Sequence, residues 1–486
     1  MSIKLYNSLT NKVEPFVPVD GKFVRMYNCG PTVYGRVHIG NIRSFLMADL
    51  LKRFLILKGY QVRQVMNITD VGHMTSDSDE GEDKLQIAAD KEKLDPWKIA
   101  DKYMRLFMDD LNKLNIDDAD VYPRATQHIN EMIEVIKKLI DNGYAYVSGG
   151  NVYFDITKFP EYGKLSGNVL EKLQSQERAI YDPNKRNPQD FVLWFSHSKY
   201  KNHIMNWDSP WGEGYPGWHI ECSAMALKYL TDAFNEHFDS EKSTTIDIHT
   251  GGEDNKFPHH ECEIAQSEGA TRQRFVNYWM HVTHLLVEGN KMSKSLNNIY
   301  TLPDILYQGY KPEALRYVLL TTHYRQKLNF TFKNLQASQN AIDRLQELIF
   351  NLKHTGNESG GFEAENFAEK VKDDFIKELE KDLNIAGAIG VLFDAVKTIN
   401  KSLTNIGQQE ADILLDMLKD LDKVLGVLDF SEHAPLEKEI QEIIEQRDRA
   451  RKSKDFATAD KIRDNLKKRG IHLIDTPEGT IWKREQ

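Results

Sequence analysis

The sequence predicts an α/β protein whose first domain is built on a parallel β-sheet. Two apolar runs, FVRMYN at residues 23–28 and YQVRQVMNIT at residues 60–69, are typical of buried strands. Between them, apolar residues recur at the spacing of a helix. A strand, a helix and a second strand form a βαβ unit, in which the two strands run parallel and a ligand crevice lies at their carboxyl ends.

The helix of this unit is defined by its apolar positions and by a glycine stop. Its apolar residues follow three- and four-residue steps from Ile42 onward: Phe45, Leu46, Leu50, Phe54 and Leu57. Gly59 follows the last turn, where glycine commonly ends a helix. A charged helical stretch is expected at residues 83–114, followed by mixed α/β sequence to about residue 210.

Strand patterns of the parallel sheet resume at residues 246–249 and 284–287, so an insertion is expected to split the first domain. Beyond residue 330 the pattern is almost wholly helical, and a small mixed α/β segment closes the chain. The expected domains are a split Rossmann-type domain (1–115 and 210–300), an insertion (116–209), a connecting region (301–345), a helical bundle (346–430) and a C-terminal domain (431–486).

The composition is that of an ordinary globular protein. The 486 residues exceed one compact core, and 40% of them are hydrophobic and 28% charged. Neither a membrane-spanning run nor the apolar segment of a secretion signal is recognisable. The three cysteines are too sparse for a disulfide framework. We therefore expect a cytoplasmic protein without a membrane partner, whose thiols are reduced and are candidates for metal binding or catalysis.

A basic segment near the end of the chain contrasts with the net charge of −10. Residues 447–469 hold ten Lys/Arg and four Asp, a net charge of +6. The overall charge argues against non-specific coating of nucleic acid, but a local basic patch remains compatible with a specific contact. The alternative is a solvated helix surface with internal salt bridges.

Two motifs carry the first resemblance. PTVYGRVHIGN at residues 31–41 lies between the first strand and its helix, and KMSKS at residues 291–295 follows about 250 residues later. Together, in this order and context, they resemble the HIGH and KMSKS signatures of class I aminoacyl-tRNA synthetases. The resemblance implies the class I synthetase fold and the ATP-dependent formation of an aminoacyl adenylate.

The chemistry of that reaction fits these residues. A helix N-terminus at residues 38–41 offers N–H groups to phosphate, and His38 adds a donor beside it. Gly40 would let adenine approach the backbone, and Lys294 would follow the leaving pyrophosphate as a point charge. The catalytic residues are expected to be His38, Asn41, Lys291 and Lys294. Separately, His38 could be an ordinary helix cap and the lysines a solvated loop.

Two further segments narrow the resemblance. GYPGWHIECSAM at residues 214–225 and GGEDNKFPHHECE at residues 251–263 are similar to the zinc- and amino-acid-binding segments of cysteinyl-tRNA synthetases. The resemblance places one Zn²⁺ per chain on Cys29, Cys222, His259 and Glu263. A helix beginning near Pro258 would put His259 and Glu263 on one face, because their spacing is i, i+4. Two thiolates, an imidazole and a carboxylate are a tetrahedral zinc set.

A zinc ion would explain how such an enzyme selects cysteine. Shape alone separates cysteine from serine poorly, since a small difference in a pocket is worth only ~1–3 kcal/mol. Zinc prefers a thiolate to a hydroxyl and lowers the pKa of a bound thiol. The expected substrates are L-cysteine, ATP with Mg²⁺, and tRNA(Cys).

The resemblance also implies the remaining substrate contacts. Cysteine would be enclosed by Gly30, Thr69 and Trp218, although Trp218 could equally be a core aromatic residue. The expected ATP-binding residues are Thr32, His38, Gly40, Asn41, Gly252, Asp254, Val287 and Lys294.

The chain departs from the family pattern at several positions. The helix motif ends in Asn41, the usual form in this family, and Asn297 stands where glycine is common; asparagine tolerates a left-handed backbone. Residues 71–83 form a longer segment whose role the sequence leaves open. Cys262 is a further thiol beside Glu263, but neighbouring helix residues diverge by about 100°, so we expect it to face away from the metal.

The tail after residue 431 resembles the family's anticodon-binding domain, which favours a tRNA contact for the basic segment. The resemblance also assigns the tRNA acceptor end to residues 116–209 and a stem contact to residues 301–345, and a monomer is expected. Three alternative functions are a ligase that acylates an amino sugar, an inactive tRNA-binding relic, and a synthetase for methionine or glutamate. The tail argues against the amino-sugar ligase. The intact His38 and Lys294 argue against the inactive relic, and the zinc set divided along the chain argues against a methionine or glutamate enzyme.

Overall fold

The computed structural model describes residues 2–72, 84–168, 182–196, 203–293, 296–355, 360–431, 434–453, 455–476 and 479–484. The chain divides into two compact units, Met1–Leu428 and Asp429–Gln486. Within the described ranges, every helix is too short or too polar to traverse a lipid bilayer.

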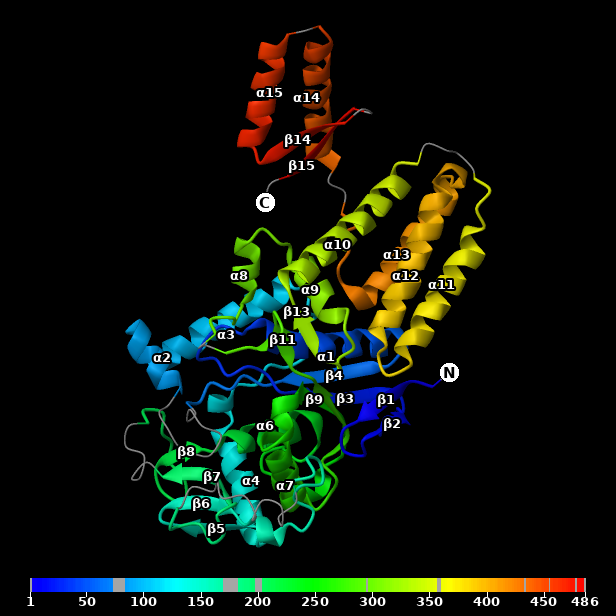
Figure 1. Cartoon of the computed structure of the whole chain (residues 1–486). Helices are drawn as coiled ribbons and strands as arrows, with labels where there is room; N and C mark the ends of the chain where they lie inside the picture. Colours follow the sequence, from blue (N-terminus) through cyan, green and yellow to red (C-terminus); the bar gives the residue numbers. More distant parts are fainter. Residues whose placement is uncertain are drawn as a thin grey trace. The chain divides into compact units, whose positions relative to one another are not determined.

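The first unit is organised around a four-stranded parallel sheet (Figure 1). Its strands, in spatial order, are β10 (Val276–Val282), β9 (Ile246–Gly252), β3 (Phe23–Asn28) and β4 (Gln61–Met66). Consecutive neighbours pair in parallel register, for example Tyr27 with Val65 on one side and with His249 on the other. The predicted parallel sheet is confirmed, as are its strands at residues 23–28 and 246–249.

One strand of the sheet was missed and another was assigned to the wrong sheet. The strand beside β9 is β10, whereas β11 (Leu285–Val287) belongs to a separate sheet with β12 (Asn290–Lys291) and β13 (Leu328–Phe330). Only Thr283 and His284 separate β10 from β11. In the sequence the two strands therefore form one apolar stretch. They are distinguished only by their partners, β9 for β10 and β12 with β13 for β11.

Helix α1 (Ile39–Leu57) crosses from β3 to β4 and completes the predicted βαβ unit. It ends at the C-cap Lys58, and Gly59 follows with φ +80°. This left-handed conformation suits glycine and stops the helix where the sequence predicts. The N-terminus of α1 consequently lies at the carboxyl end of β3, in the crevice of the sheet.

The segment between β4 and β9 supplies helices and a second, antiparallel sheet. Helices α2 (Lys84–Glu92) and α3 (Pro96–Lys113) follow β4. The antiparallel sheet has the order β5 (Ala145–Ser148), β6 (Asn151–Phe154), β7 (Phe191–Ser196) and β8 (Gly214–Pro216). Helices α4 (Ile129–Asp141) and α6 (Trp218–Leu230) pack on each other and on α7 (His259–Thr271), and α6 and α7 lie below the main sheet in Figure 1. A hairpin of β1 (Lys4–Asn7) and β2 (Lys12–Pro15) lies against β10.

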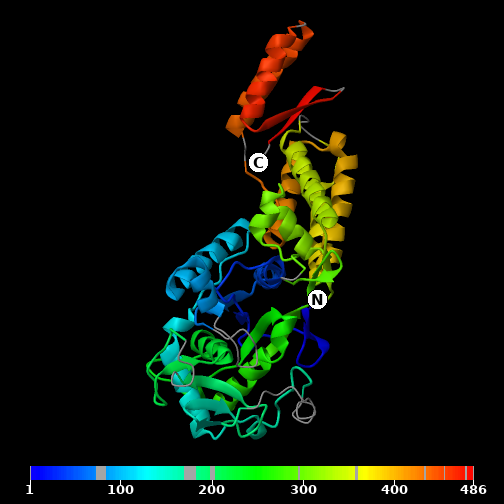
Figure 2. The same cartoon turned by 60° about the vertical axis from the view of Figure 1, so that its left-hand side comes forward.

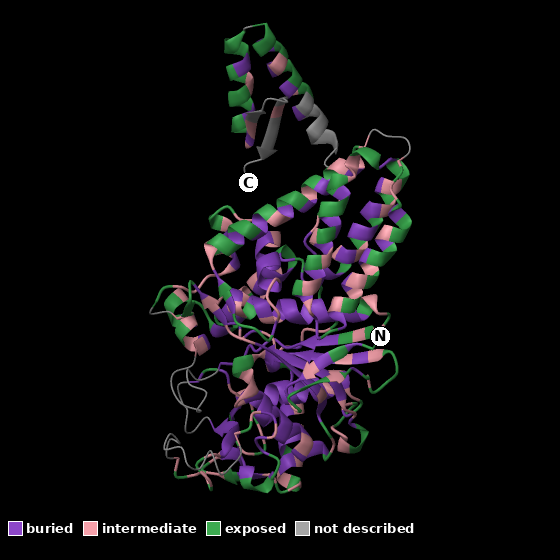
Figure 3. Ribbon diagram, turned by 45° about the vertical axis from the view of Figure 1, so that its right-hand side comes forward, coloured by how far each residue is buried: buried purple, intermediate pink, exposed green. Residues whose placement is uncertain are grey.

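The rest of the first unit is helical, as predicted. Short helices α8 (Leu302–Tyr307) and α9 (Pro312–Leu320) lead to a bundle of α10 (Phe332–Lys353), α11 (Ala364–Leu379), α12 (Ile385–Lys401) and α13 (Gln408–Leu425). In both views the four long helices lie side by side (Figure 2). Each presents an apolar stripe inward, such as Leu414, Leu418 and Leu425 on α13. Buried residues fill this interface, the main sheet and helices α1, α6 and α7 (Figure 3).

The second unit has a core of its own. It consists of α14 (Ala434–Lys452), α15 (Phe456–Lys468) and an antiparallel pair of strands, β14 (Ile471–Thr476) and β15 (Gly479–Arg484). Its core residues come from both helices and the first strand: Ile440, Ile444, Leu466 and Ile471. These features confirm the predicted mixed α/β tail.

A buried arginine joins the bundle to the parallel-sheet domain. Arg316 on α9 is fully buried, and its Nη2 donates to Asp49 Oδ2 of α1 over 2.5 Å. Its Nε donates to the carbonyl oxygen of Leu425 at the end of α13 (2.6 Å), and its Nη1 donates to that of Asn115 (2.7 Å). One guanidinium group thus holds α1, α9 and α13 together, with its charge partly balanced by Asp49.

Replacing this arginine should destabilise the first unit strongly. Arg316→Met fills similar volume but leaves buried carbonyl groups unpaired and removes one of the two arginines that balance the charge of Asp49. Breaking a buried charge pair costs about 3–5 kcal/mol, so we expect a clear fall in the thermal unfolding midpoint. Arg344→Met, which removes an exposed arginine from α10, is the control and should unfold like the parent. Equal midpoints for the two variants would contradict this role of Arg316.

Candidate active site and metal centre

A cavity of about 410 Å³ opens at the carboxyl ends of β3 and β9. Its wall brings together residues from segments far apart in the sequence. Among the predicted site residues, it is lined by Cys29, Gly30, Thr32, His38, Gly40, Asn41, Trp218, Gly252, Asp254 and Lys291. A second hollow of about 600 Å³, which includes Tyr144, Lys164 and Arg272, contains none of the predicted site residues. The first cavity is therefore the candidate active site.

The start of α1 fixes the orientation of His38. His38 is the N-cap, and its Nδ1 accepts the backbone N–H of Asn41 (3.3 Å), while Asn41 Oδ1 accepts the N–H of His38 (3.2 Å). This reciprocal capping box satisfies two N–H groups of the helix end. Burial lowers the pKa of His38, so its imidazole is neutral at pH 7. Because Nδ1 accepts, the proton resides on Nε2, which can donate to a ligand.

Two glycines allow close approaches in the cavity wall. A Cβ at Gly30 would lie 1.7 Å from the carbonyl oxygen of Asn67, so no side chain fits there. A Cβ at Gly40 would lie 2.5 Å from Cε of Met292. Gly40 therefore gives the methionine of the KMSKS motif a place to pack against α1, a contact that the sequence did not suggest.

The KMSKS motif begins on β12, and a turn lies at residues 296 and 297 after it. Lys291 is exposed on β12, whereas Lys294 lies outside the described residues. Asn298 ties the turn together, because its Oδ1 accepts the N–H of Ser293 (2.8 Å) and its Nδ2 donates to the carbonyl oxygen of Lys291 (3.2 Å). Asn297 has φ +50°, which confirms that asparagine takes the left-handed conformation here.

The four predicted zinc ligands converge beside this cavity. Cys29 follows β3, Cys222 lies on α6, and His259 and Glu263 lie on one face of α7, where Nε2 and Oε1 are 3.1 Å apart. One ligand atom from each residue lies within 4.8 Å of all the others. Their burial and their number fit a metal ion.

The protonation states of this cluster follow from burial and from mutual contact. Burial raises the pKa of the Cys29 thiol, and the hydrogen bond with Cys29, followed by burial, raises that of Cys222 well above its usual value. Burial opposes the charge on Glu263, but His249 and His259 lower its pKa to about 2. Burial likewise opposes the charge on His259, but Cys222 and Glu263 raise its pKa to about 10. Binding a metal ion would therefore displace protons from both thiols and from His259.

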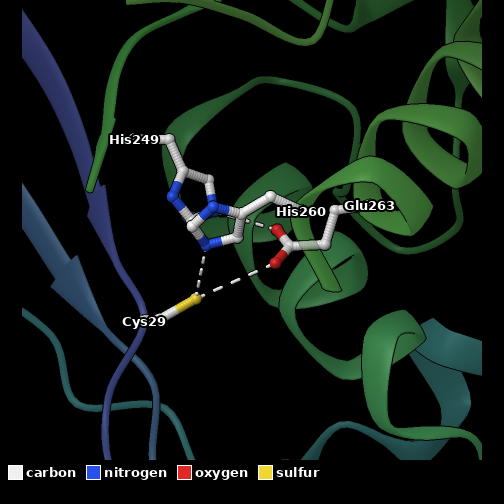
Figure 4. Close-up of side chains that lie close together, drawn as sticks. All are labelled: Cys29, His249, His260 and Glu263. Atoms are coloured by element: carbon white, nitrogen blue, oxygen red, sulfur yellow. Dashed lines mark hydrogen bonds and ion pairs between the residues drawn. The ribbon is translucent and has the colours of Figure 1, made fainter. Parts of the chain in front are cut away.

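A second set of residues overlaps the first. Cys29, His249, His260 and Glu263 also bring their ligand atoms within 4.8 Å of one another (Figure 4). Cys29 Sγ lies 3.1 Å from Nε2 of His260 and 3.8 Å from Oε1 of Glu263, and His249 Nε2 lies 2.9 Å from Oε2 of Glu263. The second set has His249 and His260 in place of Cys222 and His259, so it offers one thiol instead of two.

The sequence did not suggest His249 and His260, and it missed two more histidines that extend the cluster. His281 Nε2 lies 2.8 Å from Nδ1 of His260, and the Nδ1 atoms of His219 and His259 are 2.8 Å apart. These residues sit on β9, α7, β10 and α6. His249 ends a predicted strand, and His219 and His260 lie within the quoted motifs, so a search for histidines there could have found these three. His281 lies on β10, the strand that the sequence did not reveal.

Cys262 faces away from both metal sets. It is buried on α7, and its Sγ lies 3.4 Å from the hydroxyl of Tyr162. Neither set of converging ligand atoms includes it. The expectation that consecutive helix positions diverge is confirmed.

Cys262→Ala should therefore leave metal binding unchanged. Removing one buried sulfur atom should cost about 1 kcal/mol of stability. Zinc per chain should equal that of the parent, measured by metal analysis after gel filtration. A loss of zinc in this variant would place Cys262 among the ligands after all.

The remaining predicted residues fall in different places. Thr69 is buried, and its hydroxyl accepts Nδ2 of Asn67 (3.0 Å), while Val287 is buried in β11; neither belongs to the lining of the cavity. Trp218 lies on the wall, with its ring centroid 4.4 Å from that of His259. Asp254 also lines the cavity, and its Oδ2 lies 3.4 Å from Nδ1 of His284.

Comparison with known proteins gives this site a family. Family models match along the chain: the class I (C) tRNA synthetase catalytic domain at residues 15–340, the DALR domain at 374–429, and the cysteinyl-tRNA ligase anticodon binding domain at 433–482. The chain is 43% identical to a cysteine–tRNA ligase of Chlorobaculum tepidum, over 100% of this chain and 99% of that one. The chain belongs to the cysteinyl-tRNA synthetase family. It is likewise 44% identical to a cysteine–tRNA ligase of Brachyspira hyodysenteriae, over 99% of both chains.

Solved structures confirm the class I synthetase fold predicted for this member of the cysteinyl-tRNA synthetase family. A Mycobacterium tuberculosis methionyl-tRNA synthetase in complex with methionyl-adenylate is similar, with a TM-score of 0.59 and 16% identity over 84% of this chain and 90% of that one. A LeuRS ternary complex from Agrobacterium radiobacter has a TM-score of 0.59 and 13% identity, over 85% of both chains. At such low identity the likeness concerns the fold alone.

Proposed function

We propose that the chain is a cysteine–tRNA ligase, which joins L-cysteine to ATP as cysteinyl-adenylate and transfers cysteine to the 3′-terminal ribose of tRNA(Cys). The observation that carries this proposal is that the start of α1 and Cys29 of the metal cluster line one cavity. Such a cavity can hold a thiol-bearing amino acid next to a nucleotide.

In the first step, a carboxylate oxygen of cysteine attacks the α-phosphorus of ATP, and the bond to pyrophosphate breaks. Nε2–H of His38, at the positive end of the α1 dipole, would face the developing negative charge, and Asn41 holds His38 in place. Lys291 and Lys294 are proposed to neutralise the leaving pyrophosphate. Thr32, Gly40, Gly252, Asp254 and Val287 would bind ATP, supplied with Mg²⁺.

Zinc fits the metal cluster better than other common ions. Cys29 and Cys222 supply two thiolates, and with His259 and Glu263 they make a mixed tetrahedral set. We favour this set over the one with His249 and His260 because two thiolates suit zinc and select against hard cations. Bound zinc supplies a borderline-soft cation that prefers the thiolate of cysteine to the hydroxyl of serine. Gly30, Thr69 and Trp218 would enclose the amino acid.

The domains would divide the handling of tRNA. Residues 1–115 and 210–300 form the catalytic domain, 116–209 receive the acceptor end, and 301–345 contact the stem. Residues 346–430 belong to the bundle, whose first helix, α10, begins at Phe332, and 431–486 bind the anticodon. A cytoplasmic monomer is proposed. The second candidate, a ligase for an amino sugar, would have no need of an anticodon-binding domain, and the match at residues 433–482 weighs against it.

Amino-acid-dependent pyrophosphate exchange tests the proposal. The zinc-loaded protein should exchange pyrophosphate with cysteine, and much more slowly with serine or methionine, with one zinc per chain in the same sample. Exchange with methionine instead of cysteine would overturn the substrate assignment. Activation of cysteine with acylation of an amino sugar, and none of tRNA(Cys), would favour the second candidate.

A further inference from the structure

Lys84, the first residue of α2, reaches into the wall of the active-site cavity. Its Nζ lies 5.9 Å from the ring centroid of Tyr34 and 5.9 Å from that of Trp218. Both distances fall within the range of cation–π attraction. The two rings therefore hold the ammonium group at the wall without neutralising its charge.

Lys84 differs from Arg36, another cation of the cavity, in its pairing. Arg36 on the same wall is held by Asp109 and Asp110 of α3, with a distance of 3.5 Å from its Nε to Asp110 Oδ2. In the described part of the chain, Lys84 has no acidic group within ion-pair distance. Its positive charge can therefore meet a ligand anion without first breaking an ion pair with a described residue.

The location of Lys84 identifies the end of the cavity that it serves. Trp218, over which it lies, has its ring centroid 4.4 Å from that of the metal-cluster residue His259. Met292 of the KMSKS motif packs instead against Gly40 of α1. Lys84 therefore lies at the end that would receive the amino acid.

Cysteine would bring three polar groups to this end: a thiol, an ammonium group and a carboxylate. The metal cluster accounts for the thiol but offers nothing to the carboxylate, because its remaining groups are acidic or occupied by one another. A carboxylate placed against aromatic rings and thiols needs a cation to offset its lost hydration.

We propose that the ammonium group of Lys84 binds the α-carboxylate of cysteine and aims it at the α-phosphorus of ATP. This inference rests on the proposed function and adds a substrate-binding residue to it. One carboxylate oxygen is held by Lys84, and the other forms the bond to phosphorus as pyrophosphate leaves; Lys84 transfers no proton. The site is half-exposed, so the ion pair would orient the carboxylate without suppressing its nucleophilicity.

Cysteamine, which is cysteine without its carboxylate, provides a direct test. Binding of cysteine and of cysteamine to the zinc-loaded protein would be measured for the parent, Lys84→Met and Lys84→Arg. Lys91→Met, which removes an exposed lysine from the same helix, is the matched control. Loss of a charge-assisted contact should weaken cysteine binding roughly tenfold or more in Lys84→Met, and less in Lys84→Arg.

Affinity for cysteamine, the KM for ATP in exchange and the zinc content should stay at parent values in Lys84→Met. Equal weakening of cysteine and cysteamine, or a rise confined to the KM for ATP, would overturn the carboxylate contact. So would a Lys84→Met variant that behaves like Lys91→Met. A parent protein that does not activate cysteine would instead contradict the proposed function itself.

Discussion

Cys222→Ser should lose its zinc and, with it, the activation of cysteine. The Cys222 thiol is 1% exposed on α6, and the contacts of the metal cluster surround it. A serine hydroxyl occupies nearly the same space but does not ionise to a soft ligand at neutral pH, so the cluster would keep one thiolate instead of two. We expect zinc affinity to fall at least ~100-fold and pyrophosphate exchange with cysteine to fall by a similar factor or more.

The same substitution should lower stability without unfolding the chain. Metal binding stabilises the folded state by mass action, and this contribution disappears when the ion is lost. The parallel sheet and the bundle keep their own apolar cores, so the far-ultraviolet circular dichroism spectrum at 25 °C should be unchanged. The unfolding midpoint of the parent should fall to that of the variant when a chelator removes its zinc.

Two companion variants separate the overlapping metal sets. Cys262→Ala, a second buried cysteine variant, should retain both zinc and activity. If zinc is held by Cys29, His249, His260 and Glu263, then Cys222→Ser would keep stoichiometric zinc and His260→Gln would lose it. That pair of results would overturn the ligand set proposed here.

Ending the chain at Leu428 should separate the two half-reactions. The boundary falls between the two compact units, and the four core residues of the second unit all lie beyond it. Every described residue of the active-site cavity and of the metal cluster lies before residue 300. The shortened protein should therefore retain near-normal pyrophosphate exchange with cysteine, whereas aminoacylation should fall ~100-fold or more in kcat/KM for tRNA.

The reason lies in the charges of α14 and α15. Of the ten basic residues in the segment 447–469, eight are exposed: Arg449, Arg451, Lys452, Lys461, Arg463, Lys467, Lys468 and Arg469. Arg447 is buried instead, and its Nη1 donates to Thr480 Oγ1 (3.0 Å), while Lys454 lies outside the described residues. Exposed cations near phosphates raise affinity in a salt-dependent way, by about one unit of log–log slope per contact.

The loss should consequently have an ionic signature. A high concentration of tRNA should partly rescue aminoacylation by the shortened protein, and its affinity for tRNA should fall less steeply with added salt than that of the parent. Charge-reversed Lys467→Glu in the full chain should move both properties in the same direction but by a smaller amount. Equal aminoacylation efficiency with and without the second unit would contradict its role in tRNA binding.

The sequence was most informative where structure is local. The βαβ unit, the glycine stop at Gly59 and the shared face of His259 and Glu263 each depend on spacings of a few residues, and all three are present. The basic segment was also visible, but its composition could not separate the buried Arg447 from the exposed cations.

Features that depend on tertiary contacts were missed. The strand β10 was hidden because it continues almost directly into β11, and its place in the sheet depends on its partner β9. His249 and His281 can be assigned to the histidine cluster only from the structure, in which β9 and β10 bring them toward α7. In the sequence Lys84 looks like any other helix lysine, and only the structure shows that its ammonium group lies near the rings of Tyr34 and Trp218. The role of Arg316 likewise requires the ends of three helices.

The capping box at His38 has a consequence for the readiness of the site. Since Nδ1 is engaged by the N–H of Asn41, folding of the helix itself selects the imidazole tautomer that carries its hydrogen on Nε2. The lowered pKa keeps that tautomer uncharged across the neutral range. The ATP phosphate that we propose to bind here would thus meet a donor that is already aimed and needs no rearrangement of protons or dipoles as charge develops. The reorganisation energy for this contact is supplied when the chain folds, long before any nucleotide arrives.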